Sequence, residues 1–180
     1  MQFNTLFTVS ALSLALCSSA LAKDTSYFFE GKYSLLDGKA TSYVNTASQT
    51  TDFITLSAGM HIDDFRVYAG YDPMRWNDAK ADTFSLNADY IGIFNNSDTS
   101  WYAGGGIGTM KYESDLFSES SRKTVATVRT GLLYQINSLV YLTAGLRYIY
   151  TNNMKIQHSR YFYSKLENMF GADFGFGVRF

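Results

Sequence analysis

The stretch NMFGADFGFGVRF, residues 168–180, alternates between large apolar side chains and small or charged ones. Its apolar positions are Phe170, Ala172, Phe174, Phe176, Val178 and Phe180. Gly171, Asp173, Gly175, Gly177 and Arg179 lie between them. Because successive side chains of a β-strand point to opposite faces, the stretch predicts a strand with one wholly apolar face. Glycine on the other face is a poor choice for a sheet that meets water, since glycine weakens strands.

The same period of two recurs along the chain. The apolar faces comprise Tyr27, Phe29, Gly31, Tyr33 and Leu35; Ile54, Leu56, Ala58, Met60 and Ile62; Phe65, Val67, Ala69 and Tyr71; Phe84, Leu86, Ala88, Tyr90 and Phe94; Ala126, Val128, Leu132, Tyr134 and Ile136; and Val140, Leu142, Ala144, Leu146, Tyr148 and Tyr150. The glycine-rich segment 101–112 predicts one more strand, with Tyr102, Met110 and Tyr112 opposed to Thr109 and Lys111. Because of its glycines, the sequence does not decide which face of that strand points inward.

The faces opposite the apolar ones carry charges of both signs. They are Glu30, Lys32, Arg66, Asp89, Arg129, Arg147, Asp173 and Arg179. In a small barrel these side chains point inward, where small residues relieve crowding and charges must pair, since an isolated buried charge is costly. The sequence therefore predicts an all-β fold, a transmembrane antiparallel up-and-down barrel of about eight strands. Side chains fill the interior of a barrel of that size, so no wide channel is expected.

The connections between the predicted strands alternate in length. Short joins fall at 63–64, 95–100 and 137–138, and long polar ones at 37–51, 72–82, 114–123 and 151–165. Short periplasmic turns and longer outer loops are typical of outer-membrane barrels, so we expect the long connections outside the cell. Tyr71, Tyr112, Tyr148 and Tyr150 near the strand ends are candidates for an interfacial aromatic girdle.

The first 22 residues, MQFNTLFTVSALSLALCSSALA, have an apolar stretch followed by small residues around Leu21. This pattern predicts a secretory signal peptide over 1–22, cleaved before Lys23, and a barrel domain over 23–180. Leu16 before Cys17 argues against lipoprotein processing. Cys17 is the single cysteine, so the mature chain would have no disulfide, reactive thiol or cysteine zinc site. The chain has no uninterrupted apolar run of about 18 residues, which argues against membrane-spanning helices.

Composition and motifs give little support to catalysis or to nucleic-acid binding. The formal net charge is -1, which disfavours a nucleic-acid partner. His61 is expected to be a structural residue inside the barrel, and the neighbours His158 and Ser159 diverge on an extended chain. The glycine run 104–108 lacks the Lys and Ser or Thr that follow in a phosphate-binding loop. The pair Asp63 and Asp64 is expected to form a turn. The glycosylation sequon 95–97 is expected to be part of a turn as well. We expect no catalytic residue, no metal and no cofactor.

The alternating Phe174, Phe176 and terminal Phe180 look like the sorting signal of bacterial outer-membrane barrels. The chain from 23 to 180 is similar to the small eight-stranded barrel family that includes opacity-type surface antigens and OmpA/OmpX-type barrels. This resemblance implies a place in the outer membrane of a Gram-negative bacterium, contact with its lipid and lipopolysaccharide, and recognition of Phe180 by the barrel-assembly machinery. Barrel enzymes of this size that trim lipid A carry a His-x-Ser arrangement, from which the QHSR of residues 157–160 departs.

These observations favour a structural or adhesin-like surface protein that interacts through its outer loops, without catalytic activity. Cations in or beside the loops are candidates for contact with lipopolysaccharide phosphates or an acidic host surface. They are Lys39, Arg75, Lys80, Arg122, Lys123, Lys155, Arg160 and Lys165. Two alternatives stay open: a lipid A-modifying enzyme built on His158 and Ser159, and a narrow solute pore through the glycine-lined interior.

Overall fold

A computed structural model describes residues 25–42, 46–76, 79–94, 97–114, 117–151, 154–157 and 163–180. The strands in these ranges are β1 (Thr25–Ser42), β2 (Thr46–Ile62), β3 (Phe65–Trp76), β4 (Ala79–Ile93), β5 (Thr99–Ser114), β6 (Phe117–Gln135), β7 (Val140–Tyr150), β8 (Met154–Gln157) and β9 (Tyr163–Arg179). The expected signal peptide, Asn95 of the sequon, and the pair His158 and Ser159 lie outside the described residues.

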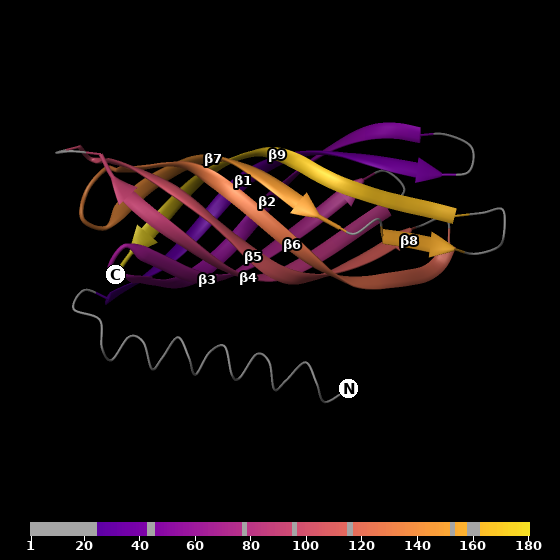
Figure 1. The fold of residues 1–180 in the computed structure, drawn as a ribbon, viewed down its shortest axis with the longest axis horizontal. Coiled ribbons are helices and arrows are strands. Elements are labelled where there is room, and N and C mark those ends of the chain that lie inside the picture. Colours follow the sequence, from indigo (N-terminus) through magenta and orange to yellow (C-terminus); the bar gives the residue numbers. More distant parts are fainter. Residues whose placement is uncertain are drawn as a thin grey trace, which may run out of the picture.

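Each of the strands β1 to β7 pairs with its neighbour in sequence, β7 pairs with β9, and β9 pairs back with β1. All these pairings are antiparallel. Eight strands therefore close into a barrel, and the short β8 extends the wall by pairing with β9 at one end (Figure 1). The predicted antiparallel up-and-down barrel is confirmed. Closure leaves the wall without the unpaired edge that open sheets present.

The two ends of the barrel differ. The tight join at Asp63 and Asp64, the joins between β4 and β5 and between β6 and β7, and the C-terminal end of β9 share one end, here called the short-turn end (Figure 1). Asp63 adopts a positive φ of 51°, which aspartate tolerates better than most residues and which allows the chain to reverse quickly. Asn137 holds its own turn by accepting hydrogen bonds from the backbone N–H groups of Leu139 and Val140. The opposite end is called the hairpin end.

The predicted long loops at the hairpin end are largely strand, which corrects the sequence-based boundaries. The pairing of β1 with β2 continues to Thr41 opposite Thr46, and that of β3 with β4 continues to Trp76 opposite Ala79. β5 and β6 likewise leave only residues 115–116 between them. The backbone ladder continues past the apolar band because each added pair satisfies an N–H and a C=O whatever side chain it carries.

The alternation of side chains confirms the predicted outward faces on seven of the wall strands. Phe84 is 65% exposed and Val128 is 64% exposed, although both are large and apolar. The outward face carries such residues on every wall strand, and a continuous apolar surface of this extent is not stable in water. A closed barrel with an apolar outside and a polar inside is the arrangement that spans a lipid bilayer with strands.

The structure decides the inward face of β5, which the sequence left open. Tyr102, Met110 and Tyr112 point into the barrel and are at most 3% exposed, whereas Trp101 and Ile107 face outward. The glycines between them offer no contrast between apolar and polar positions, so the local pattern does not set the parity. Pairing with β4 sets it instead, because the inward Gly104 leaves room for the backbone and carboxylate of Asp89. Tyr112 is therefore an interior residue and no part of an aromatic girdle.

The position of the Tyr102 ring depends on two glycines of the adjacent strands β6 and β7. Gly131 in β6 and Gly145 in β7 are direct partners in the ladder. A Cβ atom on Gly131 would lie 2.7 Å from Cζ of Tyr102, and one on Gly145 would contact the Tyr102 hydroxyl and lie 2.7 Å from the backbone oxygen of Thr130. The two missing side chains make the space that the phenol ring occupies.

We therefore expect Gly145→Ala to lower the free energy of unfolding by about 1–3 kcal/mol, because it overpacks the interior. The measurement is a urea titration of the folded barrel in lipid vesicles, followed by tryptophan fluorescence. Gly31→Ala is the matched control, since a Cβ atom there has nothing within 4 Å. Adding Tyr102→Phe to Gly145→Ala should recover part of the loss. Equal stability of the two alanine variants would contradict this packing.

Candidate functional site

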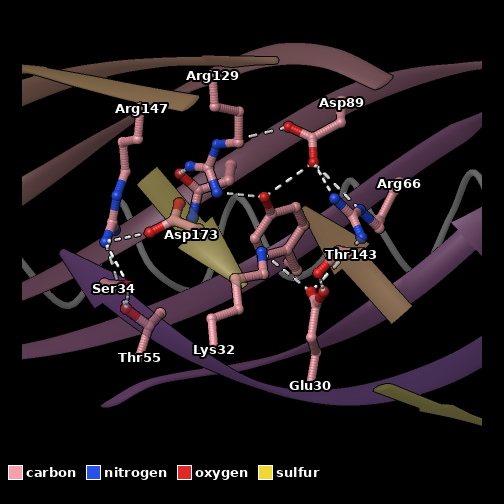
Figure 2. A network of polar contacts seen from close by, with 12 residues as sticks. Glu30, Lys32, Ser34, Thr55, Arg66, Asp89, Arg129, Thr143, Arg147 and Asp173 are labelled. Atoms are coloured by element: carbon pink, nitrogen blue, oxygen red, sulfur yellow. Dashed lines mark hydrogen bonds and ion pairs between the residues drawn. The ribbon is translucent and has the colours of Figure 1, made fainter. Parts of the chain in front are cut away.

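The middle of the barrel holds a layer of ionised side chains. Those buried there are Glu30, Lys32, Arg66, Asp72, Asp89, Arg129, Arg147 and Asp173. Four carboxylates thus face four cations, and this balance is what a low-dielectric interior demands. Figure 2 shows that the side chains converge from different strands of the wall. We call these eight residues the interior charge network.

Asp89 is the junction of the network nearest the short-turn end. Its Oδ2 accepts hydrogen bonds from Nη2 of Arg66 at 2.7 Å and from Nε of the same guanidinium at 3.1 Å. The hydroxyl of Tyr68 donates to the same oxygen at 2.8 Å. On the other side, Nε of Arg129 lies 3.6 Å from Oδ1 (Figure 2). A single carboxylate therefore bridges two guanidinium groups from β3 and β6.

Glu30 continues the network across the barrel. Its Oε2 lies 3.0 Å from Nζ of Lys32 and 3.5 Å from Nη1 of Arg66. Its other oxygen accepts a hydrogen bond from the Thr143 hydroxyl at 2.7 Å. Arg129 also donates to the hydroxyl of Tyr68 and to the amide oxygen of Asn87. Neutral hydrogen-bonding groups thus pair with several of the donors and acceptors that the ion pairs leave over.

A second cluster lies nearer the hairpin end, around Arg147. Its Nη1 lies 3.0 Å from both carboxylate oxygens of Asp72. Its Nη2 lies 3.1 Å from Oδ1 of Asp173 and 2.9 Å from Oγ of Ser34. The Thr55 hydroxyl donates to Asp72 at 2.6 Å. Arg147 is therefore shared by two carboxylates, as Asp89 is shared by two arginines.

The structure places seven of the eight charges singled out in the sequence in this network and puts the eighth elsewhere. Arg179 lies at the short-turn end, where its Nη2 is 3.5 Å from Nε2 of His61. Asp72 is not among the eight charges that the sequence singles out, yet it belongs to the network as an ion-pair partner of Arg147. The signal was present, because Asp72 continues the inward parity of Arg66 and Tyr68 on β3. It was obscured because the same residue stands at the start of a predicted loop.

Apolar side chains close the interior on both sides of the network. Toward the short-turn end lie Phe28, Tyr68, Tyr102, Leu133 and Tyr141. Toward the hairpin end lie Leu36, Phe53, Met74, Ala81, Met110, Tyr112, Val125, Ile149 and Met169. Sequence reasoning expected polar inner faces and did not anticipate this larger cluster. The interior is thus a packed core in three layers, with the interior charge network in the middle.

His61, a candidate residue for chemistry that the structure describes, lies in a structural setting. The ring centroid of His61 is 5.0 Å from that of Phe28 and 6.3 Å from that of Tyr141, so the imidazole is part of the aromatic packing. Among the described residues, no cluster of histidine, cysteine and carboxylate side chains could hold a metal ion. No helix within the described ranges is long and apolar enough to cross a membrane.

The three phenylalanines of the expected sorting signal, Phe174, Phe176 and Phe180, all face outward from β9 and the residue after it. Phe180 also extends the pairing of β9 with β1 by one residue. Its backbone N–H donates to the oxygen of Tyr27 at 2.9 Å, and its oxygen accepts from the N–H of Tyr27 at 2.8 Å. Their rings stack with centroids 6.3 Å apart.

The loop cations of the sequence fall into different environments. Arg75, Lys80 and Arg122 lie on strands β3, β4 and β6 at the hairpin end. Lys123 is partly buried on the inward parity of β6. The side chains of Lys39, Lys155 and Lys165, and the whole of Arg160, lie outside what the structure describes.

The network makes a quantitative prediction about stability. Asp89→Asn should lower the free energy of unfolding by about 3–5 kcal/mol, because it leaves two buried guanidinium groups without their shared countercharge. Asp82→Asn is the control. The side chains of Arg75 and Asp82 are 51% and 30% exposed, so their ion pair should contribute less than about 1 kcal/mol. Denaturant titration in lipid vesicles measures both. A similar loss for the two variants would refute the role of Asp89 as a junction.

Comparison with known proteins identifies the fold. No family model matches the chain, and no curated protein matches it in sequence. Among solved structures, Neisserial surface protein A superposes with a TM-score of 0.67 at 22% identity, over 88% of this chain and 100% of that one. The N-terminal β-barrel domain of Pseudomonas aeruginosa OprF gives 0.55 at 14% identity, over 87% of this chain and 100% of that one.

Ail, the attachment invasion locus protein of Yersinia pestis, gives a TM-score of 0.51 at 17% identity, over 87% of this chain and 97% of that one. Identities this low establish the fold and nothing finer. The superpositions agree with the eight-stranded closure of the wall. The chain therefore folds as a small eight-stranded outer-membrane β-barrel.

Proposed function

We propose that this protein is a non-catalytic surface protein of the Gram-negative outer membrane, whose sealed barrel holds interacting hairpins outside the cell. The observation that supports this most strongly is the packed interior. Arg66, Tyr102, Tyr141, Met74 and Met110 are among the largest side chains that are fully buried in it. An interior occupied in this way favours an anchor over a solute pore, because a pore needs a continuous polar path.

The hairpin end supplies the surface for interaction. Strand pairing continues there beyond the apolar band, from Leu35 and Ile54 to Thr41 and Thr46 in the case of β1 and β2. Paired strands present side chains on a stiff frame, which lowers the ordering cost of binding. Two of the proteins with this fold are described as a surface protein and an attachment invasion locus protein, and we extend that kind of role to this chain.

Two features of the chain ends fit export and assembly. We propose that residues 1–22 act as a signal peptide and that residues 23–180 form the mature protein. We also propose that Phe174, Phe176 and Phe180 are read by the assembly machinery before the barrel closes. These rings face outward and are 52–71% exposed, so a role in recognition is compatible with their exposure.

Hairpin truncation tests the surface role. Replacing residues 39–48 by Asn-Gly keeps Gly38 opposite Gln49 and gives a two-residue turn that suits antiparallel strands. Comparable cuts are made one at a time in the other hairpins. We expect every variant to retain heat-modifiable gel migration and at least one to lower the adhesion of expressing bacteria to cultured epithelial cells. The control shortens the join over residues 94–98 at the short-turn end. Unchanged adhesion in all variants, including one with every hairpin cut, would exclude this function.

Substitution of the last residue tests the sorting role. Phe180→Ala keeps both backbone hydrogen bonds to Tyr27, so the purified chain should refold in detergent as the unchanged chain does. In cells, the folded fraction in the outer membrane should fall, because the recognition residue is lost. Val178→Ala removes an outward apolar side chain from the same strand and serves as the control. A refolding defect in detergent that matches the defect in cells would assign Phe180 to stability instead.

A further inference from the structure

A group of cations on the outer wall of the barrel is not used by the interior or by the hairpin tips. Arg75, Lys80, Lys111 and Arg122 lie on β3, β4, β5 and β6 at parities that face away from the interior. Lys111 and Arg122 are direct partners in the ladder between β5 and β6, so two like charges stand side by side. Such a pair is unfavourable unless an anion lies between the charges.

Carboxylates on the same wall neutralise only part of this charge. Oδ1 of Asp82 lies 2.9 Å from Nη2 of Arg75 and accepts a hydrogen bond from the Tyr71 hydroxyl at 3.0 Å. Glu113 contacts Nζ of Lys111 and lies 2.8 Å from Nζ of Lys80. Hydrogen bonds from these two lysines lower the pKa of the Glu113 carboxyl to about 2, so it stays ionised at any physiological pH.

Two carboxylates, Asp82 and Glu113, therefore form ion pairs with three of the four cations. Among the side chains that the structure describes, none forms an ion pair with the Arg122 guanidinium. That group is exposed. The described outward side chains at this end of β3 to β6 thus carry an excess of positive charge, and Arg122 is the cation among them with the most freedom to bind an external anion.

A groove lies at this point of the wall. Its lining residues are Tyr71, Asp82, Phe84, Thr109, Lys111 and Arg122, and its volume is about 330 Å³. The rings of Tyr71 and Phe84 pack with centroids 4.7 Å apart. The groove therefore has cations toward the hairpin end and aromatic side chains toward the apolar band.

A second groove continues in the direction of the short-turn end along the same strands. It has a volume of about 370 Å³, and its outward-facing lining includes Val67, Leu86, Ala88, Gly105 and Ile107. Leu86 is the next outward residue after Phe84 on β4, and Ile107 is the next after Thr109 on β5. A polar groove thus lies directly above an apolar one on the lipid-facing wall.

We propose that this wall binds lipid A, the phosphorylated glycolipid of the outer leaflet. Lys111 and Arg122 hold one of its phosphates, and an acyl chain lies in the apolar groove over Gly105. A guanidinium with an ammonium beside it suits a phosphate dianion, because charge-assisted hydrogen bonds to phosphate are short and strong. The position favours lipid A over an inner-leaflet phospholipid, since the cations stand at the hairpin end of the apolar band. This site goes beyond the proposed function, which concerns the hairpins, but it rests on that proposal for the placement of the hairpin end outside the cell.

The folded barrel is purified from outer membranes and stripped of lipid in detergent. Native mass spectrometry then measures how much bisphosphorylated lipid A it binds. The variant Lys111→Gln/Arg122→Gln should bind lipid A at least about tenfold more weakly than the unchanged chain. Lys39→Gln/Lys165→Gln is the control for general attraction, because it removes the same charge from β1 and β9, which are not strands of this site. Equal weakening in the control would overturn the site in favour of general attraction.

Two further measurements keep the result decisive. Ala88→Phe fills the apolar groove without removing charge, so it should weaken binding of lipid A even if the charge variant folds poorly. Dephosphorylated lipid A should bind weakly to the unchanged chain, and equal binding of the two forms would overturn the phosphate contact. Equal binding of phosphatidylglycerol would overturn the assignment to lipid A. Gel migration confirms folding, and the adhesion assay reports separately on the proposed function.

Discussion

The structure depends on one constraint, which is that every backbone N–H and C=O inside a bilayer must find a partner within the protein. The chain meets it by pairing β9 with β1, so that the sheet has no edge at the seam. The last contacts of that seam are the two backbone hydrogen bonds between Tyr27 and Phe180. Closure with eight strands then decides how wide the interior is, and a narrow interior must be filled by side chains.

Filling that interior explains why ionised groups are buried and why they are shared. A carboxylate such as Asp89 between Arg66 and Arg129, or a guanidinium such as Arg147 between Asp72 and Asp173, satisfies two partners in little space. Some of the ion pairs join strands that are not neighbours in the sheet, as Arg129 on β6 does with Asp89 on β4 and Arg147 on β7 does with Asp72 on β3. They specify one arrangement of the interior, because any shift would leave a charge without its partner.

The outside of the wall is divided along each strand into regions with different surroundings. The apolar band faces lipid, and paired strands continue beyond it as hairpins. Between these two regions stand the outward cations of β3 to β6, with Lys111 next to Arg122. The packed interior lies behind the described strands of this boundary region, so it supports the side chains that these strands present on the outside.

The sequence by itself determined the class of fold, because alternation is a local property that strands such as 170–180 carry in full. It also determined that charges like Asp173 face inward, as their neighbours are apolar. Only the tertiary structure decided the parity of β5, the pairing of Asp72 with Arg147 and the meeting of Lys111 with Arg122. These depend on the register between strands. Register is set by contacts between residues far apart in the chain, and no local period records it.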